Sequence, residues 1–122
     1  MNAIRRIDDI ADNYTRHVGA DYVGLWQIAG RVRDDMRLRD NKEVKEKTLL
    51  VVRRLLEHGL HPGDYVHPRF EFWKESDPDS IIKRIDKEWN PSRGDPNLGE
   101  PICWFDALPG TKHYANHRMR HV

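Results

Sequence analysis

The spacing of apolar residues changes near residue 59, and this change restricts the possible folds more than any other feature of the chain. Before it, apolar side chains recur every three or four residues, which is typical of amphipathic α-helices. After it, two brief runs at 61–66 and 69–73 are rich in aromatic and β-branched residues, which is typical of a β-hairpin. The sequence therefore predicts a helical first half followed by a small sheet.

The helical half divides into three segments. Residues 3–18 form the first, and Gly19 ends it because glycine tolerates the left-handed conformation at a helix end. The short extended stretch 21–23 leads into a second helix, from Leu25 to Met36. Another break precedes a third helix over about 42–58, whose outer face is dense in Lys and Glu.

A fourth helix and a third strand follow the hairpin. The sequence Ser-Asp-Pro-Asp at 76–79 supplies a capping side chain and a proline at the first helical position, both typical of a helix start. A last apolar run, PICWFDAL, predicts a strand. We therefore expect a small antiparallel sheet from residues near 63–66, 69–73 and 102–106.

The order helix, short strand, two helices and two strands is that of a winged helix, with an added helix and a closing strand. We expect an α+β, mainly helical, winged-helix-like single domain over residues 1–110, with about four helices and the small sheet. A polar, His-rich tail is expected over 111–122. The predicted core comprises Ile7, Ile10, Leu25, Trp26, Ile28, Val32, Val52, Leu55, Leu56, Phe70, Phe72, Ile82, Ile85, Trp89 and Trp104.

Composition restricts the class of protein. A chain of 122 residues suits one domain with a modest core. Four Trp, four Tyr and three Phe are too many for a disordered chain. No apolar run reaches the roughly 18 residues that a membrane-spanning helix needs. A single cysteine, Cys103, excludes an internal disulfide and favours the reducing cytoplasm.

Four segments together resemble a set of small uncharacterised bacterial proteins. They are DYVGLW at 21–26, LLEHGLHPGD at 55–64, FWKESDPDSIIKRIDKEW at 72–89 and DPNLGEPICWFD at 95–106. The resemblance covers about residues 21–108 and implies a compact winged-helix-like fold, without catalytic residues to carry over. In the last segment Pro101 stands where a strand residue with an N–H is expected, which implies an edge strand or pairing that starts only at Ile102.

The loop GDPNLG at 94–99 has the residues of a phosphate-binding loop in the wrong context. Such a loop follows a strand and precedes a helix, so that backbone N–H groups converge on the anion. Here a helix precedes and a strand follows. We therefore interpret the loop as turn chemistry, in which proline fixes φ while Asn97 and Gly99 accept left-handed geometry and steer the following strand.

Cysteine and histidine residues give no catalytic or metal site. Cys103 lies between Ile102 and Trp104, and we expect it to be buried and unreactive. The tail places three histidines four residues apart, a spacing that binds a transition metal on a helix, but we expect a solvated tail. These three are His113, His117 and His121; a second group is His58, His61 and His67. The sequence predicts no cofactor, metal or catalytic residue.

Two functional hypotheses remain. Residues 31–54 carry nine Lys/Arg against five Asp/Glu, which indicates a basic face or only the interleaved charges of solvated helices. The first hypothesis is a non-enzymatic protein-interaction module, because aromatic residues and Arg dominate binding hot spots. The alternative is a winged-helix DNA-binding transcriptional regulator, which three glutamates on the third helix disfavour. Both would use the candidate face Lys42, Lys45, Lys47, Arg53, Arg54 and Arg69.

Overall fold

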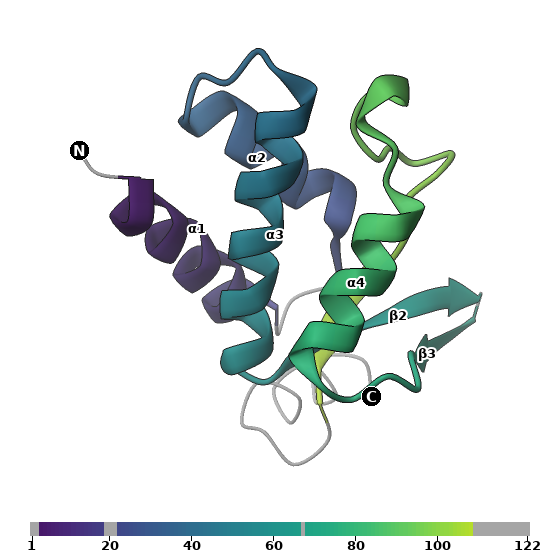
Figure 1. The fold of residues 1–122 in the computed structure, drawn as a ribbon. Coiled ribbons are helices and arrows are strands. Elements are labelled where there is room, and N and C mark those ends of the chain that lie inside the picture. Colours follow the sequence, from purple (N-terminus) through teal and green to yellow (C-terminus); the bar gives the residue numbers. More distant parts are fainter. Residues whose placement is uncertain (1–2, 19–21, 67, 109–122) are drawn as a thin grey trace.

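The computed structural model describes residues 3–18, 22–66 and 68–108, and within them it has four α-helices and a four-stranded antiparallel sheet (Figure 1). In chain order the elements are α1 (Ala3–His17), β1 (Val23–Gly24), α2 (Leu25–Asp35), α3 (Asn41–Glu57), β2 (Leu60–Val66), β3 (Arg69–Phe72), α4 (Pro78–Glu88), the 3-10 helix η1 (Pro91–Arg93) and β4 (Trp104–Ala107). The prediction of a mainly helical α+β domain is thereby confirmed. The described helices offer no segment long and apolar enough to cross a membrane.

The helix starts agree with the capping chemistry of the sequence. At α4, the Asp77 side chain accepts a hydrogen bond from the Ser80 backbone N at 3.0 Å, and Pro78 occupies the first turn. At α3, Asp40 accepts from the Lys42 N at 3.1 Å. Hydrogen bonding to backbone N–H groups lowers the pKa of Asp77, because these bonds favour the charged carboxylate.

The strand order is β1-β4-β2-β3, so the last strand lies inside the sheet. β4 pairs with β1 through Gly24↔Trp104 and with β2 through Gly63↔Trp104. The prediction from Pro101 was therefore wrong in both alternatives: β4 is a central strand, and its pairing begins at Trp104. The physical reason is a turn at Ile102, where φ is +65° and the chain cannot continue a strand.

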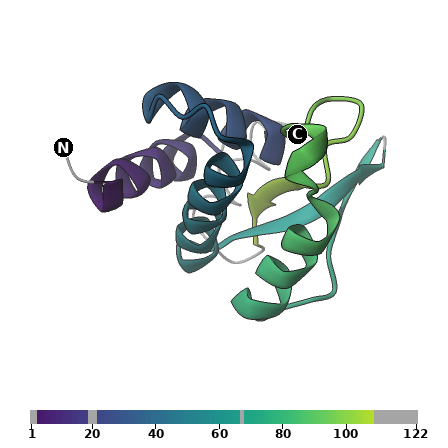
Figure 2. The same cartoon turned by 45° about the horizontal axis from the view of Figure 1, so that its top comes forward.

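The core lies between the helices and one face of the sheet. Figures 1 and 2 show α3 next to α4, with α1 on the other side of α3. Apolar side chains of all four helices meet the buried strand residues Val23, Leu60, Phe105 and Ala107 there. Because side chains alternate along a strand, these residues define the inner face of the sheet.

Most of the predicted core is confirmed, and four aromatic residues are misplaced in it. Nine of the fifteen predicted residues are buried: Ile7, Ile10, Leu25, Ile28, Val32, Val52, Leu55, Ile85 and Trp89. Leu56 and Ile82 are partly buried and pack against the core. Trp26, Phe70, Phe72 and Trp104 are only half-buried. The strand aromatics lie on the opposite face because Phe105, and not Trp104, occupies the inward position of β4.

Candidate functional site

Half of the predicted cationic face is engaged in ion pairs that brace α3 against its neighbours. Lys45 Nζ lies 2.8 Å from an Asp86 carboxylate oxygen on α4 and also donates to the Asp86 backbone carbonyl oxygen at 2.9 Å. Arg53 reaches Asp79 of the same helix at 3.0 Å.

Arg54 braces α3 on its other side. It pairs with Asp8 of α1 at 2.9 Å and with Glu57 at 3.1 Å. These two carboxylates raise the Arg54 pKa through side-chain hydrogen bonds, and the Glu57 bond is the larger cause. Lys42, Lys47 and Arg69 make no ion pair within the described ranges, so they are what remains of the predicted face.

Aromatic rings cover the other face of the sheet. We call this surface the outer aromatic face, and it consists of Tyr22, Trp26, Tyr65, Phe70, Phe72 and Trp104. Tyr22 stacks on Phe70 with ring centroids 4.7 Å apart, and Phe70 meets Phe72 edge-on at 5.0 Å. Trp26 and Trp104 form a T-shaped pair at 6.4 Å. These geometries are those that aromatic quadrupoles favour. The rings thus hold one another in place while they stay partly exposed.

Two glycines bring the rings close to the backbone. A Cβ built at Gly63 of β2 would lie 2.7 and 2.8 Å from two ring carbons of Phe70, and closer still to the carbonyl oxygen of Glu71. A Cβ at Gly24 would meet the indole of Trp26 and lie 3.0 Å from Trp104. These rings can come so close to the sheet backbone only because the two positions lack side chains.

The sequence prediction missed this face because it assigned Phe70, Phe72, Trp26 and Trp104 to the core. Register decides the question: Tyr65 lies opposite Phe70, and Gly63 lies opposite both Phe72 and Trp104. Residues that pair directly share one face of a sheet. The available signal was the pair of small residues, Gly24 and Gly63, within two extended segments.

The two described histidines of the group near the sheet, His58 and His61, have different neighbours. His61 is buried opposite Asp106, and its Nε2 lies 3.3 Å from the Trp73 backbone oxygen. His58 Nε2 lies 3.9 Å from Asp12. The described part of the chain contains no group of three His, Cys, Asp or Glu arranged to hold a metal ion.

His67 and the tail histidines His113, His117 and His121 fall outside the described residues, as does the predicted tail 111–122.

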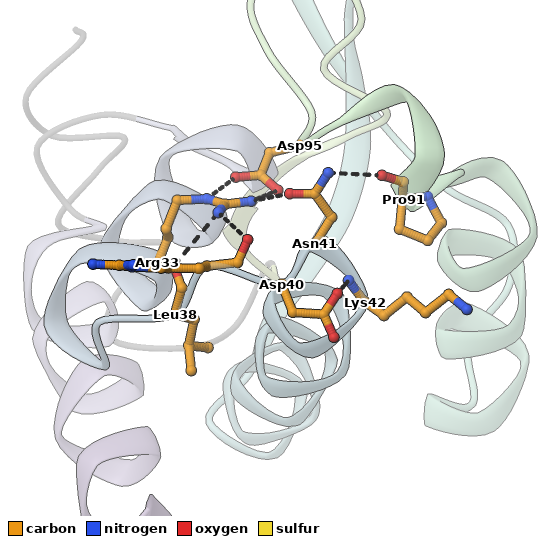
Figure 3. Close-up of polar contacts among 8 residues, drawn as sticks. Arg33, Leu38, Asp40, Asn41, Lys42, Pro91 and Asp95 are labelled. Atoms are coloured by element: carbon orange, nitrogen blue, oxygen red, sulfur yellow. Dashed lines mark hydrogen bonds and ion pairs between the residues drawn. The ribbon is translucent and has the colours of Figure 1, made fainter.

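The loop that precedes β4 is tied to the helices by one arginine (Figure 3). Arg33 of α2 grips Asp95 with two hydrogen bonds, Nε to Oδ2 at 2.8 Å and Nη2 to Oδ1 at 2.9 Å. Nη2 also donates to Asn41 Oδ1 at 2.6 Å, while Asn41 Nδ2 donates to the Pro91 carbonyl at 3.1 Å. The hydrogen bond to Asp95 raises the Arg33 pKa. We call this arrangement the Arg33 clamp. The prediction of left-handed geometry at Asn97 and Gly99 was wrong: neither has a positive φ, and the loop takes one at Gly94 (+94°) instead. The Asn97 side chain turns the chain by accepting hydrogen bonds from the Gly99 N at 2.8 Å and the Glu100 N at 3.1 Å.

Ile102 ends the loop in a strained conformation. Its φ of +65° lies in the left-handed region, and the Cys103 N donates to the Pro101 carbonyl at 2.7 Å, which makes a tight three-residue turn. A β-branched residue is an outlier at such a φ. The turn directs the chain from the loop into the centre of the sheet.

Because of this φ, we expect Ile102→Gly to be more stable than Ile102→Ala by about 1 kcal/mol, since only alanine keeps the Cβ that left-handed geometry disfavours. Both variants lose the Ile102 side chain beyond Cβ. At Leu50 of α3, where the backbone is helical, the order should reverse by about 1 kcal/mol. Urea unfolding of the four variants measures both differences. A less stable Gly variant at position 102 would contradict the strained turn.

Cys103 is buried, as predicted, and burial raises the pKa of its thiol well above its ordinary value. A protonated, enclosed thiol does not attack disulfides. We therefore expect a disulfide reagent at pH 8 to label the native chain only as fast as the chain unfolds, and to label it at once in concentrated guanidinium. In the unfolded chain the thiol has its ordinary pKa of about 8.5. Above that pH the unfolded chain releases a proton that the native chain retains, so the Cys103 thiol lowers the free energy of unfolding as pH rises. Fast labelling of the native chain would contradict this burial.

Comparisons of the chain with protein-family models, with curated proteins and with solved structures found no match. The resemblance to small bacterial proteins and the likeness to winged helices therefore remain predictions.

Proposed function

We propose that this chain is a non-enzymatic protein-interaction module that binds another protein with its outer aromatic face. The observation that carries the proposal is two groups of aromatic rings, each packed together by stacked or edge-on contacts, that remain partly exposed on one side of the sheet. Tyr65 is 44% exposed. Aromatic side chains carry much of the binding energy in protein interfaces.

The stacking also lowers the cost of binding. Side chains that are free in solution lose conformational entropy when a partner immobilises them. Phe70 is fixed between Tyr22 and Phe72 before any partner arrives. A contiguous apolar patch of this kind is typical of an interaction site. The single cysteine supports a cytoplasmic location for this module.

A capture experiment with matched variants tests the proposal. Tyr65→Ser changes the outer aromatic face, and Leu50→Ser changes a side chain of similar exposure, 47%, on α3. The tagged wild-type chain and both variants are incubated with cytoplasmic extract, and bound proteins are identified by mass spectrometry. We expect one protein to bind the wild type and Leu50→Ser and to be lost with Tyr65→Ser, although all three melt cooperatively. Equal capture by all three chains, or capture by none, would refute the proposal.

The alternative function, a DNA-binding regulator, has fewer cations available than the sequence offered. With Lys45, Arg53 and Arg54 in ion pairs, Lys42, Lys47 and Arg69 are left for phosphates. We therefore expect no sequence-specific DNA binding at about 150 mM salt, near physiological ionic strength.

At low salt, we expect weak attachment through three cations. The logarithm of the binding constant should then fall with the logarithm of the salt concentration with a slope of about −3. Fluorescence titration with a pool of random duplexes measures it. Nanomolar binding of one sequence in the presence of competitor DNA would establish the regulator instead.

A further inference from the structure

β3 is an edge strand, and two of its residues present their backbone groups outward. It pairs with β2 from Val66↔Arg69 to Gly63↔Phe72 (Figure 1). The pair that closes a two-residue hairpin loop is hydrogen-bonded, and bonded and non-bonded pairs alternate from there. Phe70 and Phe72 therefore turn their N–H and C=O groups away from β2. The Trp73 N bond to the Pro62 carbonyl, at 2.9 Å, fits this alternation.

Between these two residues, the hairpin carries an unfavourable pair of like charges. Asp64 lies directly opposite Glu71, both are exposed, and neither makes an ion pair within the described ranges. Like charges directly opposite in a sheet destabilise it by up to about 1 kcal/mol. Because side chains alternate, this pair lies on the opposite side of β3 from Phe70 and Phe72.

The acidic pair borders a hollow of about 590 Å³. Trp73, only 6% exposed, contributes to its wall, and its indole Nε1–H is buried without a hydrogen-bond partner among the described residues. Glu75 adds a third carboxylate, which Arg84 holds at 3.0 Å. Lys74 and Arg84 also line this hollow, but neither forms an ion pair with Asp64 or Glu71. A like-charge pair and an unpaired strand edge thus meet in one place. Such local conflicts are expected where a ligand completes the structure.

We propose that the β3 edge binds an extended segment of a partner protein in which apolar residues alternate with Lys or Arg. This inference rests on the proposed function and names the chemistry of its partner. The segment adds a fifth strand by hydrogen bonding to Phe70 and Phe72. Its apolar side chains extend the outer aromatic face, and its cation, opposite Glu71, neutralises the acidic pair.

The same charges disfavour a second copy of this chain as the occupant. A symmetric antiparallel pairing that uses both outward residues places Phe70 opposite Phe72 of the other copy and Glu71 opposite Glu71. Four carboxylates from the two hairpins would then gather at one point, which opposes association. Natural sheets protect their edges with charges in this way.

Two blocked heptapeptides provide the probe: one alternates Val and Lys, the other Val and Glu. Amide NMR spectra of the full chain are recorded during titration with each. We expect the Val/Lys peptide to shift the Phe70 and Phe72 amides and to slow their hydrogen exchange. Glu71→Lys should weaken that peptide at least tenfold and reverse the preference. Glu43→Lys, the same charge change at an exposed position of α3, should leave binding unchanged.

Several results would overturn the proposal: equal binding of both peptides, shifts confined to other surfaces, or a dimer that shifts the same amides without peptide. Glu71→Lys should also melt no lower than the wild type, because it turns the like-charge pair into an attractive one; a lower melting temperature contradicts the argument. The captured partner separates the two proposals. Loss with Tyr65→Ser but retention with Glu71→Lys refutes only the β3 edge, and retention with both variants refutes the interaction face itself.

Discussion

Gly63→Ala is expected to lower the free energy of unfolding by about 2 to 3 kcal/mol, the range of overpacking in a tight site. The new methyl group would overlap the backbone carbonyl of Glu71 and the Phe70 ring, whose carbons lie 2.7 and 2.8 Å from its position. The carbonyl belongs to a paired strand and cannot yield without disturbing the hairpin. Phe70 can move only by giving up its stacking on Tyr22.

The matched control is Gly30→Ala in α2. Apart from the adjacent residues and the backbone of α2 itself, no atom lies within 4 Å of a Cβ at this helical position, so the substitution creates no clash. It should raise the free energy of unfolding by up to about 1 kcal/mol, because alanine favours a helix over glycine by this amount. Urea unfolding of the two variants gives both values. Equal effects, or a stable Gly63→Ala chain with an intact hairpin, would contradict the packing described for the outer aromatic face.

Arg33→Ala is expected to cost about 2 to 3 kcal/mol, because it removes several charge-assisted hydrogen bonds at once. Asp95 would lose both of its bonds, and Asn41 would lose the donor to its Oδ1. Both side chains of the pair are largely buried, with 28% of Arg33 and 20% of Asp95 exposed, so water replaces the lost bonds only in part. The loop before β4 would lose its attachment to α2.

Two further variants give the comparison. Arg33→Lys keeps the charge but cannot grip a carboxylate with two parallel bonds, so it should recover less than half of the loss. Arg31 lies two residues before Arg33 and forms a surface ion pair with Asp35. Arg31→Ala removes this pair and should cost less than about 0.5 kcal/mol. Thermal and urea unfolding rank the three. Similar losses at positions 31 and 33 would mean that the clamp is no stronger than a surface ion pair.

The helices could be predicted from the sequence because their signals are local. Apolar spacing of three and four residues and the Asp77-Pro78 start each act within a few residues of the structure they specify. The predicted helix 42–58 and the observed Asn41–Glu57 differ by one residue at each end.

The sheet required information from distant parts of the chain. Whether Trp104 or Phe105 faces the core depends on which strands flank β4, and alternation alone allows both. The sequence also contains no signal for the position of β4 between β1 and β2, because partners separated by many residues leave no local pattern. Ile102 is a further example, because its φ is positive although β-branched residues disfavour such a φ.

The sequence predicted the kind of site, a protein-interaction surface, but not the residues that form it. The abundance of aromatic residues indicated an interaction surface, but the residues named for it were cations of the third helix, and three of them stabilise the domain internally. Ion pairs between helices depend on packing that cannot be read from charge counts. Arg33 and the Asp64–Glu71 pair were missed for the same reason, because their partners lie in other elements.

The central place of β4 has a consequence for the chain as the ribosome releases it. β1 and the hairpin emerge early, yet both lack their common partner until residues 104–107 arrive between them. During that interval β2 and β1 both present unpaired edges, of the kind that attract other nascent chains. A premature stop anywhere before Trp104 would make this interval permanent. The sheet is therefore complete only when β4 has joined it, and until then the chain depends on chaperones to keep its unpaired edges from aggregating.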